Sequence, residues 1–215
     1  MRQINESIKM KIFKRNKLIY GVGVNDADYF VNTTVNGKQV KCLFYQTWID
    51  MLTRCYSEKY QNKRPTYIGC TVSDCWLVFS NFKKWMELKD FKGKRLDKDL
   101  KFASNRVYSP DKCMFVTCAI NNLLTNHAAK RGLYPQGVDS PNNSVKYRAQ
   151  ISFKGKFKHL GFYTTVKSAE MAYLTAKHEI VKQAAIDEPD QEVSQALHMQ
   201  AGLIFNKLQV VGALD

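Results

Sequence analysis

Apolar and polar residues alternate along residues 147–154, which predicts a β-strand whose two faces differ in chemistry. The apolar face would carry Tyr147, Ala149, Ile151 and Phe153, and the polar face Arg148, Gln150, Ser152 and Lys154. Gly155 predicts a tight hairpin turn, after which residues 156–162 return as a second strand. A helix follows Thr164 or Thr165, with an apolar stripe formed by Ala169, Ala172, Tyr173 and Ala176. We expect the apolar face to pack on this helix; the alternative is an ordinary surface hairpin with solvated lysines.

The chain before residue 130 combines helices with short extended segments, which predicts an α+β fold. Helices are predicted over residues 44–56, 74–88 and 119–127, and Asn36-Gly37 predicts a further hairpin. Extended segments are predicted over residues 66–72, 96–99, 107–110 and 113–117. The aromatic residues of the first two helices recur at helical spacing, so we assign them to the core and not to base stacking: Trp48, Trp76, Phe79, Phe82 and Trp85.

The sequence suggests four segments. Residues 1–19 form a basic arm that lies along DNA phosphates or is simply a mobile terminus, and a basic linker places a domain boundary between 20–130 and 131–186. The tail 187–215 holds five acids (Asp187, Glu188, Asp190, Glu192 and Asp215) against one lysine, Lys207. Its apolar residues recur at helical spacing, so we expect the tail to pack on the body or to form a homodimer contact. Because the tail is acidic, we do not expect it to touch DNA.

The formal charge of +14, from 33 basic and 19 acidic residues, exceeds what solubility requires and indicates a polyanionic partner. No apolar run approaches the length of a membrane span, and no signal-peptide pattern is present, which favours nucleic acid over a membrane surface. The six cysteines are then expected to be reduced thiols in the cytoplasm of a bacterial host cell. A zinc site from Cys70, Cys75, Cys113 and Cys118 is the alternative, although its spacing is looser than that of a zinc knuckle.

The segment around the predicted hairpin resembles the APETALA2/ethylene-response-factor DNA-binding domain, which also occurs in phage homing endonucleases. The resemblance rests on Gly137-Val138, Tyr147-Arg148-Ala149-Gln150-Ile151, 160–164 and 168–173. It implies a three-stranded antiparallel sheet that packs on a helix and lies in the major groove of double-stranded DNA. The residues implied to face DNA are Gln136, Asp139, Arg148, Gln150, Ser152 and His159, with Lys154, Lys156 and Lys158 as further contacts. An acid at 139, and His159 in place of the usual tryptophan, depart from the plant pattern, so the plant target site does not transfer.

Residues 20–131 resemble the N-terminal part of phage HNH-type (ββα-metal) endonucleases. The resembling pieces are residues 48–56, 96–99, 108–113 and Asn121-Asn122. In that family a hairpin and a helix hold one divalent metal, a histidine deprotonates water, and an asparagine orients the histidine. The resemblance implies Asp97 and Asn121 as metal ligands.

Two lysines break this nuclease pattern. Lys98 stands at the position of the base, and Lys112 at the position of the orienting asparagine. A lysine ammonium has a reference pKa near ~10.4, so it is no base at neutral pH, and two lysines would repel a metal cation while favouring phosphates. The four histidines (His127, His159, His178 and His198) lie outside the pattern, and only His127 is near it in sequence. The HNH-like region is therefore expected to have lost catalysis.

Three functions follow for the whole chain. The first is a sequence-specific double-stranded DNA-binding protein, derived from a homing endonuclease, that acts as a transcriptional repressor without cleavage and without a cofactor. The second is an active HNH-type nicking endonuclease that uses Mg²⁺ or another divalent metal through Asp97 and Asn121. The third is a structural or RNA-associated basic protein. If the protein forms a homodimer, an inverted-repeat target is expected.

Overall fold

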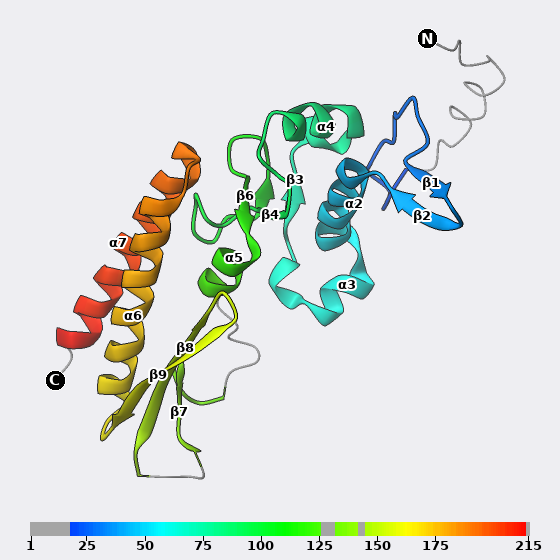
Figure 1. The fold of residues 1–215 in the computed structure, drawn as a ribbon. Coiled ribbons are helices and arrows are strands. Elements are labelled where there is room, and N and C mark those ends of the chain that lie inside the picture. The colour runs from blue at the N-terminus through cyan, green and yellow to red at the C-terminus, as the bar shows by residue number, and fades with distance from the viewer. Residues whose placement is uncertain (1–17, 126–131, 142–144, 214–215) are drawn as a thin grey trace. The chain divides into compact units, whose positions relative to one another are not determined.

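The computed structural model describes residues 18–125, 132–141 and 145–213, and it has an α+β fold with four small sheets among these residues (Figure 1). Two compact units are present: residues 1–92 with 102–113, and residues 93–101 with 114–215. Most of the predicted basic arm, His127 and the predicted boundary after residue 130 lie outside the described residues.

The first unit begins with a hairpin and continues mainly as helices. Strands β1 (Asn32–Val35) and β2 (Lys38–Lys41) pair around Asn36 and Gly37, whose φ angles of 51° and 73° fit the predicted tight turn. Helices α2 (Leu43–Tyr56), α3 (Glu58–Lys63) and α4 (Phe79–Glu87) follow, with short 3₁₀ turns at Pro65–Tyr67 and Asp74–Leu77. Strand β3 (Thr71–Val72) pairs in parallel with β5 (Val107–Tyr108).

The helix predicted over residues 74–88 is in fact split into a 3₁₀ turn and α4. The carbonyl of Leu77 accepts a hydrogen bond from the N–H of Val24, and the N–H of Phe79 donates to the carbonyl of Val24. A backbone pairing with Val24 therefore uses the groups that a continuous helix would need. A bridge between residues so far apart in sequence leaves no signal in the local periodicity.

The aromatic core predicted for the first unit is confirmed for four of its five residues, whereas Trp85 is only partly buried. Trp48, Trp76, Phe79 and Phe82 are almost completely buried. The indole N–H of Trp48 donates to the carbonyl of Trp76 at 2.7 Å, and the rings of Trp48 and Phe79 lie 5.5 Å apart between centroids. These rings fill the interior of the unit and offer no stacking surface to a nucleic acid.

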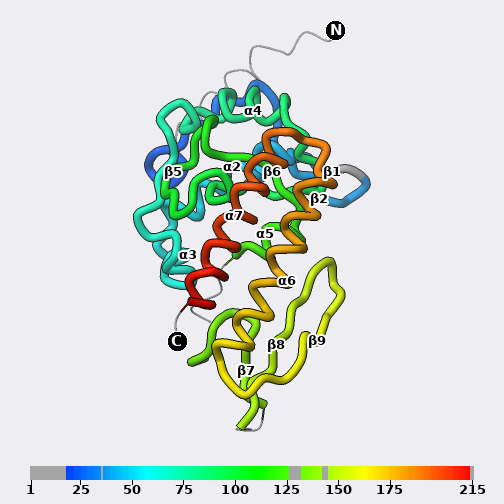
Figure 2. Tube along the Cα trace, turned by 90° about the vertical axis from the view of Figure 1, so that its left-hand side faces the viewer, coloured from blue at the N-terminus to red at the C-terminus, as the bar shows by residue number. Residues whose placement is uncertain are grey.

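The second unit contains a two-stranded pair, a three-stranded sheet and two long helices. Strand β4 (Lys94–Asp97) pairs antiparallel with β6 (Met114–Thr117), which leads into α5 (Cys118–Leu124). Strands β7 (Val138–Asp139), β8 (Tyr147–Phe153) and β9 (Lys156–Tyr163) form an antiparallel sheet in that order. Helices α6 (Val166–Asp187) and α7 (Gln191–Ala213) run side by side, and Figures 1 and 2 show α6 alongside the sheet.

One core joins the β4–β6–α5 segment to the C-terminal sheet. Its buried members include Leu100, Met114 and Ile120 from that segment and Ile151, Leu174 and Val181 from the sheet and α6. Residues 93–101 and 114–125 therefore pack with the C-terminal part of the chain, whereas sequence position alone had grouped them with residues 20–92.

The tail packs on its own unit. Val193, Leu197 and Ala201 of α7 are buried in the core that contains Val181 and Ala185 of α6. Two tail acids pair with lysines of the 93–101 segment: Glu188 with Lys94 at 3.5 Å and Glu192 with Lys101 at 2.6 Å. The first of the two predicted roles of the tail is thus present. None of the described helices is long and apolar enough to cross a membrane.

Candidate nucleic-acid interface

The alternation along residues 147–153 does produce two different faces. On the inner side, Ala149 and Ile151 are buried, and they belong to cores that include Ala169, Tyr173 and Leu174 of α6. On the other side lie Arg148, Gln150 and Ser152, which pair in register with Phe162, His159 and Phe157 of β9. Directly paired residues share a face of an antiparallel sheet, so we call these six residues, together with Asp139 of β7, which pairs with Arg148, the outer face.

A β-bulge shapes the outer face. Ala149 pairs with Gly161 but Gln150 pairs with His159, so Leu160 is an extra residue in β9. Gly161 has a φ of 128°, a conformation that favours glycine. The bulge shifts the alternation by one residue, and Phe162 therefore shares the outer face with His159, their ring centroids 4.9 Å apart. Strict alternation from His159 would have turned Phe162 towards the helix.

Two exposed aromatic residues on the outer face were not foreseen. Phe157 is 64% exposed and Phe162 is 54% exposed. Phe157 could have been found from the sequence, because it lies two residues before His159 on the same strand. Phe162 could not, since its side depends on the bulge.

Asp139 holds two of the predicted DNA contacts together. The Arg148 guanidinium donates from Nε to Oδ1 of Asp139 at 2.9 Å and from Nη2 to Oδ2 at 2.7 Å. Gln150 donates from Nε2 to the same Oδ2 at 3.0 Å. The carboxylate raises the pKa of Arg148 because it stabilises the charged guanidinium. An acid from β7 and two donors from β8 thus form one cluster, the Asp139 cluster, at the edge of the outer face.

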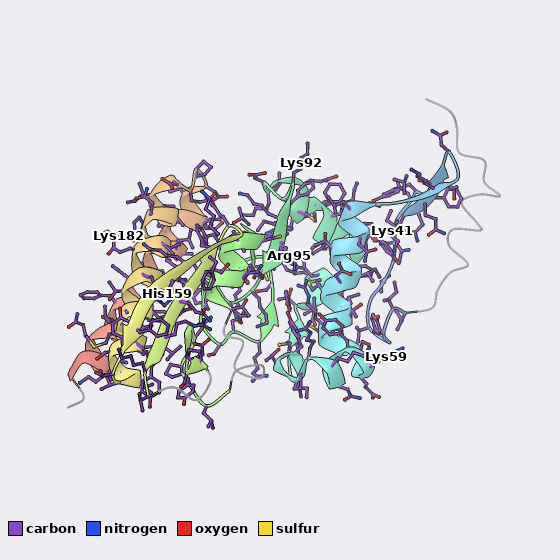
Figure 3. The ribbon with its side chains drawn as sticks, turned by 60° about the horizontal axis from the view of Figure 1, so that its bottom comes forward. Lys41, Lys59, Lys92, Arg95, His159 and Lys182 are labelled. Atoms are coloured by element: carbon purple, nitrogen blue, oxygen red, sulfur yellow. The ribbon has the colours of Figure 1, made fainter. Side chains whose placement is uncertain are left out.

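The predicted lysine contacts occupy different positions. Lys154 lies in the hairpin turn with a φ of 51°, and its Nζ is 5.4 Å from the centroid of the Phe153 ring. Lys156 and Lys158 are exposed but pair with Phe153 and Ile151, so the register places them on the helix-facing side of β9 and not with Arg148. Figure 3 labels basic residues of both units, among them Lys41 and Lys59 in the first and His159 and Lys182 in the second.

Gln136 is directed into the unit. Its Oε1 accepts a hydrogen bond from the buried Lys177 at 3.1 Å, and its Nε2 donates to the carbonyl of Thr125 at 3.2 Å. It lines a cavity of about 270 Å³ together with Asn122, Gln150, Ser152 and Phe157. That volume is just below the ~300–1,000 Å³ of typical small-molecule sites. We interpret the cavity as a recess beside the outer face, and the two hydrogen bonds of Gln136 hold that residue in the wall of the recess.

The residues of the nuclease pattern lie in both compact units. Asp97, Lys98 and Asn121 belong to the second unit, and Lys112 to the first. Oδ1 of Asp97 accepts hydrogen bonds from the backbone N–H groups of Asp99 at 2.8 Å and Leu100 at 2.7 Å. Burial raises the pKa of Asp97 above its ordinary value, against the effect of these two donors. The carboxylate thus closes the turn after β4.

The side chain of Lys98 also has a partner within the protein. This side chain is buried, and its Nζ lies 2.6 Å from Oδ1 of Asp99. This ion pair ties the Lys98 side chain to the same turn. Asn121 lies on α5, which packs back on β4, so the two-stranded pair and the helix of the pattern are adjacent.

Within the described residues, no three His, Cys, Asp or Glu side chains come together as a group that could hold a metal ion. All six cysteines are described and none forms a disulfide; Cys55, Cys70 and Cys113 are buried. Of the four cysteines of the zinc alternative, Cys70, Cys75 and Cys113 belong to the first unit and Cys118 to the second.

No protein-family model matches the chain, and neither the curated proteins nor the solved structures contain a significant match.

Proposed function

We propose that this protein binds double-stranded DNA in a sequence-specific manner through the outer face of β8 and β9. The observation that carries this proposal is the register that groups Arg148, Gln150, Ser152 and His159 on one face while the opposite face is packed on α6. Arginine, glutamine and serine are side chains that hydrogen-bond base edges in the major groove. A two-stranded ribbon is also narrow enough to enter that groove, which is about 12 Å wide.

The charge of the chain supports the same partner. With a net charge of +14, the protein is attracted to phosphates irrespective of sequence, and this attraction supplies the non-specific part of DNA affinity. The exposed rings of Phe157 and Phe162 add apolar surface suited to thymine methyl groups and sugars. In this proposal the charge provides the non-specific affinity, and the outer face provides the sequence specificity.

Binding of a DNA site without cutting it is the activity that best fits the β4–β6–α5 segment. Asp97 closes a turn, and Lys98 pairs with Asp99 where an HNH nuclease has its base. A protein that binds a specific site and leaves it intact blocks transcription from a promoter that overlaps the site. We therefore propose that this protein acts as a transcriptional repressor.

Selection of bound fragments from a random-sequence duplex library tests the proposal. We expect a recurrent sequence after several rounds, with protection of that sequence in a footprint at about 0.15 M salt, where non-specific binding is weakened. Recovery of fragments with the same composition as the input library would contradict it.

A nicking endonuclease is the second candidate, because β4, β6 and α5 bring Asp97 and Asn121 into one small strand–strand–helix assembly. This candidate predicts that a plasmid carrying the selected site is converted to the open circle in Mg²⁺ or Mn²⁺, and that Asp97→Asn abolishes the conversion. Asparagine keeps the oxygen that accepts from Asp99 and Leu100, so loss of nicking would report on metal binding and not on folding. A plasmid that stays supercoiled favours the repressor.

A further inference from the structure

We propose that Asp139 is a specificity-determining residue of the outer face: it directs Arg148 to a guanine, fixes the amide of Gln150 for an adenine, and lowers affinity for DNA of other sequence. This inference rests on the proposed DNA binding and names the base chemistry of that site. The carboxylate is the only acid among the DNA contacts predicted from the sequence, and it accepts three hydrogen bonds within the Asp139 cluster.

The hydrogen bonds decide which edge of Arg148 is left for DNA. A guanidinium has five N–H donors, and Asp139 uses the one on Nε and one of the two on Nη2. The second N–H of Nη2 and those of Nη1 remain, and they form the terminal edge with two parallel donors. This pair matches the two acceptors, O6 and N7, that guanine presents in the major groove.

The same carboxylate orients Gln150. Its Nε2 donates to Oδ2 of Asp139, and the reverse orientation would bring the amide oxygen against a negative charge. The amide therefore keeps Oε1 as a free acceptor and one N–H as a donor. Adenine offers the complementary pair, its N6 amino group and N7, so the cluster selects a guanine and an adenine.

Charge gives Asp139 a second effect. The ion pair with Arg148 is about one-third exposed on both sides, so a phosphate near the cluster meets a neutral pair and not a free cation. A carboxylate also repels phosphates that a bare arginine would attract. Asp139 should thus weaken binding to every sequence except the one whose bases satisfy Arg148 and Gln150.

The test compares the wild-type protein with Asp139→Asn on two duplexes of equal length, one with the selected sequence and one random. We expect Asp139→Asn to bind random DNA more tightly, with a steeper salt dependence equivalent to about one more phosphate contact. We expect the ratio of random to selected dissociation constants to fall about tenfold, since a bidentate base contact discriminates by about that order. A new selection with the variant should lose the preference at the guanine position.

Asp187→Asn is the matched control, because it removes an exposed acid of the same unit from the end of α6 and not from the outer face. It should leave the ratio within about twofold of the wild type, as expected of a surface charge that touches no DNA. A wild-type preference for the selected site that Asp139→Asn retains within twofold, with unchanged melting temperature, overturns this inference and leaves the proposed function intact. A wild-type protein that shows no preference for any sequence overturns both.

Discussion

The sheet β7–β8–β9 and the β4–β6–α5 segment belong to one compact unit, yet they use their polar side chains in opposite ways. On the outer face, Asp139 holds Arg148 and Gln150 by their side chains, and donors remain for a partner. After β4, Asp97 is used by the backbone N–H groups of its own turn, and Lys98 by the neighbouring acid. Side-chain types alone suggest chemistry in both places, but only the hydrogen bonds distinguish a surface open to a ligand from a structural turn.

The largest expected effect is the difference in stability between substitutions on the two faces of the hairpin. Ile151→Ala removes a buried side chain from the core beneath the sheet and should lower the free energy of unfolding by about 2–5 kcal/mol. Ser152→Ala, one residue along on the outer face, should change it by no more than about 0.5 kcal/mol. Chemical denaturation of both variants gives the two values, and similar losses would mean that the outer face is itself packed.

A substitution just before β7 should lower the stability of the protein by nearly as much. Gly137 has a φ of 79°, and a Cβ there would lie 2.0 Å from the Tyr173 ring, so Gly137→Ala should cost about 3 kcal/mol from strain and overpacking together. Gly155→Ala is the control, because Gly155 has a similar φ of 73° but open space around its Cβ position, and it should cost only about 1–2 kcal/mol. Equal thermal shifts for the two variants would show that the contact with Tyr173 does not fix the sheet on α6.

A smaller loss of stability should show how α7 supports the turn that follows β4. Nε2 of Gln200 donates to the carbonyl of Leu100 at 2.8 Å, just beyond the turn that Asp97 closes. Gln200→Ala should lower the free energy of unfolding by about 1 kcal/mol, the usual contribution of one such bond. Met199→Ala is the neighbouring control on an exposed position of α7 and should have little effect. The Leu100 N–H, which donates to Asp97 in the adjoining turn, should exchange faster in the first variant only, because that turn loses its bond to α7.

The smallest effect, at Asp97, depends on pH. Burial raises the pKa of Asp97 in the folded protein, so its protonated form is favoured there and the carboxylate costs stability as the pH rises through the range between the ordinary and the raised pKa. Asp97→Asn keeps an acceptor for the turn and carries no charge. The stability of the variant relative to the wild type should therefore increase from pH 3.5 to pH 7, and a constant or decreasing difference would contradict the raised pKa.

Local pattern was sufficient to predict much of this fold. The alternation at residues 147–153, the Asn36-Gly37 turn and the helical stripe around Trp48 all appear where expected, because each depends on neighbouring residues. The split of the second predicted helix and the grouping of residues 93–101 with the C-terminal sheet depend on contacts between distant residues, which periodicity does not record.

The candidate site shows the same limit. The faces of Arg148, Gln150 and Ser152 followed from alternation, whereas the position of Phe162 required the bulge at Leu160. The sequence analysis placed Lys156 and Lys158 among the DNA contacts, but the register turns them to the other side of the strand. The ion pair of Asp139 with Arg148 joins two strands whose register could not be read from composition.

The central claim is that the outer face makes DNA binding by this protein sequence-specific, and one competition measurement tests this claim most directly. Dissociation constants for the selected and the random duplex are compared for the wild type, Arg148→Ala with Gln150→Ala, and Lys182→Ala on the helix behind the sheet. We predict that the double variant loses at least about tenfold more affinity for the selected duplex than for the random one, and that Lys182→Ala weakens both to the same small extent. Equal losses on the two duplexes for the double variant would contradict the claim.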